Sequence, residues 1–165
     1  MTLHDFQALM EGLAPCCPVR PSARIEDAVD IEVDDTLVSV QWSESSGLLE
    51  LTLTLPVVID GGEHPQAQLA LYRALLERHW LETGGDAGIG FGLMPSSDEV
   101  VGMATLDGAT VPGPDAFLDA VQLTLASAIG EWLGVCGQVL MQQVAAAGSA
   151  PEEGVAPPSP PLLPV

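Results

Sequence analysis

The chain has 165 residues, of which 47% are hydrophobic and only 4% aromatic, which is typical of one globular domain with an aliphatic core. Twenty-three acidic residues against four arginines and no lysine give a formal net charge of −19. Nucleic acid and anionic membranes are bound through basic residues that neutralise phosphate, so this balance argues against both partners. It favours solubility and basic or amphipathic partners.

The N-terminus and the cysteines predict a cytoplasmic protein. The opening sequence MTLHDFQALMEGL carries Asp5 and Glu11 and lacks the basic region of a signal peptide. No apolar run approaches the ~20 residues that a membrane span needs. The three cysteines are an odd number and Cys16 is adjacent to Cys17, which is typical of free thiols in a reducing compartment.

A short amphipathic helix is predicted first. Thr2 can cap a helix that begins at Leu3 and ends near Gly12. Its apolar residues fall at helical spacing and form one stripe: Leu3, Phe6, Leu9, Met10 and Leu13. The stripe is either core or a binding surface, because Phe and Met suit adaptable contacts. Pro15, Pro18 and Pro21 then predict a loop that runs to about Glu26.

From Ala28 to Leu55 the hydrophobic period changes to two, which predicts strands. Three strands over residues 29–33, 37–42 and 49–55 are separated by turn signals at Asp34-Asp35 and Ser45-Ser46-Gly47. Residues 57–59 are a further extension that Pro56 leaves open. The result is an antiparallel meander whose edges could pair with an incoming extended segment.

Residues 64–82 predict the central helix, with Pro65 in its first turn and Gly84-Gly85 after its end. One apolar stripe is formed by Leu69, Tyr72, Leu76 and Trp80. Leu71 and Leu75 widen this stripe beyond what one sheet face would cover. We therefore expect one face of the helix to pack on the sheet and another to meet a second copy of the chain.

Residues 89–94 and 99–106 predict two more strands, and the final helix is expected from Asp115 to about Ala147. Its apolar face is Phe117, Val121, Leu125, Ile129, Trp132, Cys136, Val139 and Leu140. Gly130, Gly134 and Gly137 each weaken a helix by roughly 1 kcal/mol relative to Ala, so this one must be held by packing or be bent or broken there.

The predicted element order α-β-β-β-α-β-β-α indicates the α+β class, a twisted antiparallel sheet flanked by helices. We expect one domain over residues 1–147. A Pro-rich composition over 148–165 predicts a disordered tail.

No catalytic or metal-binding pattern emerges from the sequence. His4, His64 and His79 have no metal-ligand spacing, and Cys16-Cys17 is not a C-x-x-C motif. The glycines of 88–92 lack the G-x-G-x-x-G spacing of a phosphate loop, and no serine lies in a G-x-S-x-G elbow. We therefore expect no enzymatic activity, no cofactor and no metal.

The order of elements, the length and the acidity resemble the class I chaperones of type III secretion, the Tir-chaperone-like (CesT-like) family. Three segments carry the resemblance: IEVDDTLVSVQWSESSGLLELTLTLP, LALYRALLERHWL and GFGLMPSSDEVVGMATLDG. It spans about residues 1–147. Family members often have an L-L-x-x-N pattern in the central helix, whereas here Leu75-Leu76-Glu77-Arg78 is followed by His79.

This resemblance implies a homodimer in the bacterial cytoplasm with a role in virulence. Such a chaperone binds the N-terminal segment of a secreted effector in extended form and keeps it secretion-competent. A contact with the ATPase of the secretion apparatus is a further expectation. The effector-binding residues implied are Leu3, Phe6, Leu9, Met10, Leu13, Ile31, Val33, Val38, Val40 and Trp42. The implied dimer contacts are Leu69, Tyr72, Leu76 and Trp80.

Two other functions remain open from the sequence. An acidic adaptor or immunity-type protein would bind a folded basic partner, with an affinity that falls steeply with salt. A small-molecule-binding or enzymatic α+β domain would need a deep, polar-lined pocket.

Overall fold

A computed structural model describes residues 1–58, 64–82, 88–94 and 99–148, with the side chains of 76–82 and 147–148 left undescribed. The elements in chain order are α1 (Leu3–Leu13), β1 (Val19–Pro21), β2 (Val29–Val33), β3 (Thr36–Trp42), β4 (Leu48–Thr54), α2 (Pro65–Glu82), β5 (Gly90–Leu93), β6 (Val100–Asp107), a 3-10 turn η1 (Gly108–Thr110) and α3 (Pro114–Gly148). The α+β class is confirmed. Gly148, the first residue of the predicted tail, is the last residue of α3, and residues 149–165 lie outside the described residues.

The sheet has six strands in the order β1-β2-β3-β4-β6-β5, and every neighbouring pair is antiparallel. Strands β2 to β4 form the predicted meander. At the β2–β3 turn, Asp34 and Asp35 have φ of 49° and 59°, and Gly47 has φ of 69° before β4. Two consecutive left-handed residues are typical of a tight hairpin turn, and aspartate tolerates that conformation.

Strand β1 corrects the predicted loop to Glu26. Val19 pairs with Ile31 and Pro21 with Val29, so the segment adds an edge strand to β2. Three residues contain too little alternation to be recognised in sequence, and a proline without an N–H is tolerated at a sheet edge. The open extension after Pro56 is not strand at Val57 and Val58, and Ile59 lies outside the described residues.

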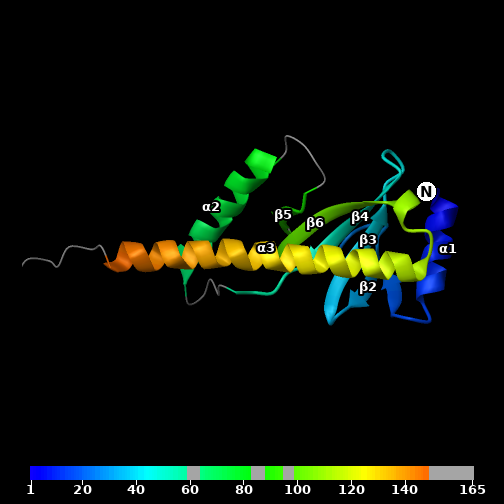
Figure 1. Ribbon diagram of the computed structural model, residues 1–165, viewed down its shortest axis with the longest axis horizontal. Helices are drawn as coiled ribbons and strands as arrows, with labels where there is room; N and C mark the ends of the chain where they lie inside the picture. Colours follow the sequence, from blue (N-terminus) through cyan, green and yellow to red (C-terminus); the bar gives the residue numbers. More distant parts are fainter. Residues whose placement is uncertain (59–63, 83–87, 95–98, 149–165) are drawn as a thin grey trace, which may run out of the picture.

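The core lies between one face of the sheet and α3, which crosses that face in Figure 1. The largest fully buried side chains from the strands are Ile31, Val38, Val40, Leu49, Leu51 and Leu53. Those from α3 include Phe117, Val121 and Trp132. A Cβ on Gly102 of β6 would lie 3.5 Å from the Ala128 Cβ of α3, so this glycine marks close approach of strand and helix.

The opposite, outer face of the sheet is polar and partly covered by residues 22–28. Arg24 donates to Thr54 Oγ1 at 2.7 Å and forms an ion pair with Glu99 at 3.1 Å. Gln41 donates to the carbonyl of Glu26 at 3.2 Å. Thr54 and Gln41 alternate with the core residues of their strands, so residues 22–28 lie over the outer face.

Helix α3 has 35 residues and continues well past the sheet, where α2 leans against it (Figure 1). It is not broken at its glycines, because Trp132, Val135, Cys136 and Val139 are buried on its other side. Packing therefore holds it, which is the first of the two predicted outcomes. Leu140, predicted as core, is 40% exposed and corrects that assignment, since α3 has passed the sheet at this point.

By length and composition alone, Pro114–Ala146 is apolar enough to cross a membrane, and it is the one such helix among the described residues. A third of its most apolar window is buried inside the protein. With Phe117 and Trp132 packed on the sheet, we interpret it as a core helix.

Candidate interaction surfaces

Helix α1 begins as predicted, with a capping box. The Thr2 hydroxyl accepts from the Asp5 N–H at 3.2 Å, and the Thr2 N–H donates to Asp5 Oδ2 at 2.9 Å. These hydrogen bonds favour the carboxylate and hold the pKa of Asp5 below its usual value of 3.8. Most of the predicted stripe belongs to the core, because four of its members are buried: Phe6, Leu9, Met10 and Leu13. The exception is Leu3, which is 49% exposed.

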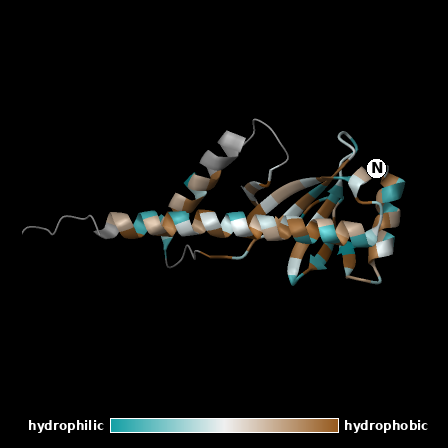
Figure 2. Ribbon diagram, viewed as in Figure 1, coloured by the Kyte–Doolittle hydropathy of each residue, from teal (hydrophilic) through white to brown (hydrophobic). Residues whose placement is uncertain are grey.

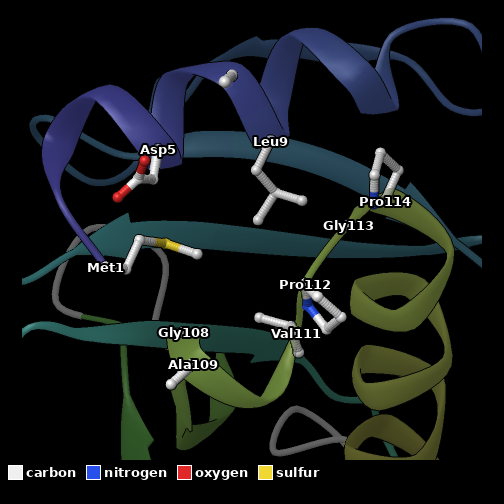
Figure 3. A pocket seen from close by; sticks show the side chains of 10 residues that line it. Met1, Asp5, Leu9, Gly108, Ala109, Val111, Pro112, Gly113 and Pro114 are labelled. Atoms are coloured by element: carbon white, nitrogen blue, oxygen red, sulfur yellow. The ribbon is translucent and has the colours of Figure 1, made fainter.

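A pocket of about 490 Å³ lies between α1 and the segment that joins β6 to α3 (Figure 3). It is lined by Met1, Asp5, Ala8, Leu9, Gly108, Ala109, Val111, Pro112, Gly113 and Pro114. Asp5 is its one ionisable side chain, and the other lining residues have apolar side chains or are glycine, with backbone polar atoms sharing the exposed lining. Leu9 is the one predicted effector-binding residue that reaches it. Sequence reasoning missed this pocket because its second wall is distant in the chain and has no recognisable pattern.

The predicted effector-binding strand residues lie on the inner face of the sheet. Ile31, Val33, Val38 and Val40 are all buried in the core. Trp42 is half-buried, and its Nε1 atom is buried with no hydrogen-bond partner among the described residues. In this arrangement the buried side chains cannot reach a partner unless α1 or α3 moves.

Helix α2 divides its apolar residues between two faces, but its buried face packs mainly on α3 and contacts the sheet at the edge strand β5, which corrects the predicted packing on the sheet. Ala67, Leu71 and Leu75 are buried where α2 contacts α3 and β5. Leu69 is 52% exposed, and Tyr72 is half-buried with its hydroxyl accepting from Gln68 Nε2 at 2.8 Å. The side chains of Leu76 and Trp80 lie outside the described residues. The dimer contact stays a prediction, with Leu69 accessible to make it.

The outer face of the sheet has a second, smaller hollow of about 200 Å³ around Met103, which is 39% exposed. Glu50, Thr52 and Thr105 line it from β4 and β6. A Cβ on Gly92 would lie 3.1 Å from Met103 Cε, so that glycine leaves room for the methionine beside β5. Sequence reasoning did not single out Met103, since one methionine in a strand has no distinguishing pattern.

The cysteines and the possible metal ligands of the described ranges were compared with the sequence patterns. No group of three His, Cys, Asp or Glu side chains there could hold a metal ion. Cys16 is exposed, while burial and the neighbouring Cys16 raise the pKa of the Cys17 thiol. Burial raises the pKa of Cys136 to about 11, so this thiol stays protonated at neutral pH.

Comparison with known proteins adds one similar structure. The sequence matches no protein-family model and no curated protein. Among solved structures, a chain described as "Structure of the HopA1-SchA Chaperone-Effector Complex" is similar over 80% of this chain and 93% of that chain, with 13% sequence identity and a TM-score of 0.47.

Proposed function

We propose that this protein is a cytoplasmic type III secretion chaperone that binds the N-terminal segment of an effector in extended form. It acts without catalysis and keeps the segment competent for export. The sequence resemblance motivates this function. The α+β architecture with an antiparallel sheet agrees with what the resemblance implies.

The observation that carries the proposal is the presence of several separate open sites with apolar side chains in their lining. The pocket beside α1 holds about 490 Å³, the hollow at Met103 about 200 Å³, and Leu93 at the edge strand β5 is 42% exposed. An extended segment places successive side chains into several such sites. A small ligand instead needs one enclosed pocket with convergent polar groups. In the larger pocket, the one carboxylate, Asp5, is already bonded to Thr2.

We include a homodimer in the proposal, with the exposed Leu69 of α2 in the contact. A two-fold dimer presents every site twice. One long client can then engage both copies, and the second contact benefits from a high effective concentration. The charge of −19 per copy keeps such a dimer soluble while apolar sites stay accessible.

The test co-expresses this chain with the N-terminal segments of the secreted proteins of the same organism, one at a time. We expect a soluble complex that co-purifies. Ala8→Glu places a carboxylate at the pocket from an exposed position of α1 and should weaken the complex by about tenfold or more, because an unpaired charge is costly when a client's apolar side chain covers it. Gln7→Glu is the matched control, since Gln7 is exposed on the same helix and does not line the pocket.

An equal effect of the two substitutions would exclude the α1 pocket as the client site. Failure of every such segment to bind would contradict the chaperone function.

The acidic adaptor is the second candidate function, and the net charge of −19 favours it. Its binding to a folded basic partner would weaken steeply between low and high salt. Anchoring of apolar side chains is salt-tolerant, so the salt dependence of the measured affinity separates the two functions.

A further inference from the structure

The face of α3 that points away from the core is apolar and rich in glycine. We call it the outer seam and define it as Gly130, Leu133, Gly134, Gly137, Leu140, Met141 and Val144. At about 100° per residue, all seven lie within about 60° of the direction of Gly137. The buried residues Ala128, Trp132 and Val139 point in the opposite direction. The seam is therefore a second apolar face and not an edge of the core.

The large side chains of the seam are accessible. Leu133 is 49% exposed, Met141 73% and Val144 70%. At Gly130, Gly134 and Gly137, an added Cβ would meet no heavy atom of the described residues within 4 Å. Another helix can therefore approach the backbone closely at the glycines, with large apolar side chains on either side. Figure 2 shows hydrophobic residues recurring along the half of α3 that extends past the sheet.

The charge of this region indicates what covers the seam. Between residues 120 and 148 the sequence contains one acidic residue, Glu131, and no basic residue, although the whole chain carries −19. Glu131 lies about 120° from the direction of Gly137, outside the seam. A basic partner would find no carboxylate to pair with here. A second copy of this acidic chain can meet the first at this face without placing like charges against each other.

The seam is also complementary to itself in shape. If two α3 helices cross antiparallel at Gly137, Gly130 of one lies opposite Val144 of the other, Gly134 opposite Leu140, and Leu133 opposite Met141. Large side chains then face glycines across most of the contact. A two-fold contact must use the same patch on both copies, and this pattern of small and large residues fulfils that requirement.

We propose that the outer seam is a self-association surface, through which the α3 helices of two copies pair antiparallel with their crossing point at Gly137. This inference rests on the homodimer of the proposed function and names α3 as an alternative to the α2 contact given there, because Leu69 and the seam point away from each other on opposite sides of the packed helices. Its occupant is a second copy of this chain.

Light scattering on the full chain tests the surface. Wild type should have the molar mass of a dimer. Met141→Glu should weaken self-association by about tenfold or more, because each dimer would then bury two unpaired carboxylates. Leu123→Glu is the matched control, since Leu123 is as exposed as Met141, 72% against 73%, but lies outside the antiparallel overlap. A wild-type monomer, or equal effects of both substitutions, would overturn the proposal.

Disulfide formation tests the crossing geometry. In a Cys16→Ser, Cys17→Ser background, Cys136 can remain, because it is buried. Gly137→Cys should form a disulfide-linked pair on mild oxidation, since the two copies meet at this residue. Met141→Cys alone should not form this disulfide. The double variant Leu133→Cys, Met141→Cys should form it, because these two residues lie opposite each other in the antiparallel pair. A strong cross-link from Met141→Cys alone indicates a parallel pair and overturns the antiparallel arrangement.

Two further outcomes separate this surface from its alternatives. If the wild-type protein sediments with neutral phosphatidylcholine vesicles and Met141→Glu abolishes sedimentation, the seam binds membrane and the self-association proposal is overturned. If Ala8→Glu weakens client binding but Met141→Glu leaves the molar mass unchanged, the seam is refuted and the chaperone function is not. A Met141-dependent dimer that binds no client would refute the chaperone function alone.

Discussion

At the scale of single residues, Trp132 joins α3 to the chain that leaves the sheet. It is 2% exposed, its Nε1 donates to the Pro56 carbonyl at 2.8 Å, and its ring lies 6.3 Å from that of Phe91. Trp132→Phe should cost about 1–3 kcal/mol of unfolding free energy, because it removes the hydrogen bond and leaves a void. Trp132→Ala should cost about 3–5 kcal/mol. Urea unfolding followed by circular dichroism measures both, and an unaffected midpoint for the phenylalanine variant would contradict the contact.

The three thiols should differ in reactivity, and the pH dependence follows from burial. Cys16 is exposed and should react at once with a thiol reagent at pH 8. Cys136 is buried with a pKa raised from 9.0 to about 11, so it should react only after denaturant is added. The folded state disfavours the Cys136 thiolate. The contribution of the protonated Cys136 thiol to the free energy of unfolding is therefore complete below pH 9.0 and is lost as the pH rises toward 11.

Rapid modification of a Cys136-only variant (Cys16→Ser, Cys17→Ser) under native conditions would show that α3 opens locally. The same variant with Cys136→Ala supplies the background signal.

At the scale of elements, substitutions in α1 test whether its apolar stripe is core or a client-binding groove. Phe6 is 7% exposed, so Phe6→Asp places a charge in the core and should cost at least about 3–5 kcal/mol, enough to unfold a marginally stable domain. Leu3 is 49% exposed in the first turn, where the helix dipole favours an acid, so Leu3→Asp should leave stability within about 0.5 kcal/mol. Thermal unfolding compares the two. A folded Phe6→Asp protein that has lost client binding would restore α1 as the groove.

Regular patterns allowed most elements to be predicted from sequence. Alternation over β2 to β4 and the turn residues Asp34, Asp35 and Gly47 specify the meander, because one face of each strand must be buried. Strand β1 was missed because three residues carry no period. Its place depends on pairing with β2.

The candidate surfaces were harder to predict than the fold. A periodic apolar stripe has the same sequence pattern whether it packs in the core or binds a partner. The pattern alone therefore does not show that Phe6 and Val38, implied as binding residues, are buried in the structure. The α1 pocket depends on residues 108–114, which only the folded chain brings to α1. The outer seam does not stand out in the sequence, because glycines within a helical segment indicate weakened helix stability before they indicate a contact surface.

At the scale of the whole molecule, the apolar outer seam lies in a segment with a single charged residue, Glu131, although the chain carries −19. Two copies with −19 each repel one another over most of their surfaces. Association at an uncharged seam should therefore strengthen as salt screens this repulsion. Binding of an extended client through apolar anchors should change little with salt, whereas client binding that weakens as salt is raised would favour the adaptor function.

The central claim is that the protein holds an extended client segment, and the stoichiometry of the co-purified complex tests it most directly. Light scattering on the complex with the N-terminal effector segment should give two copies of this chain for one client, at both low and high salt. The client should remain sensitive to protease wherever it is not covered. A complex that dissociates as salt is raised, or a client that binds as an independently folded domain, would contradict the account.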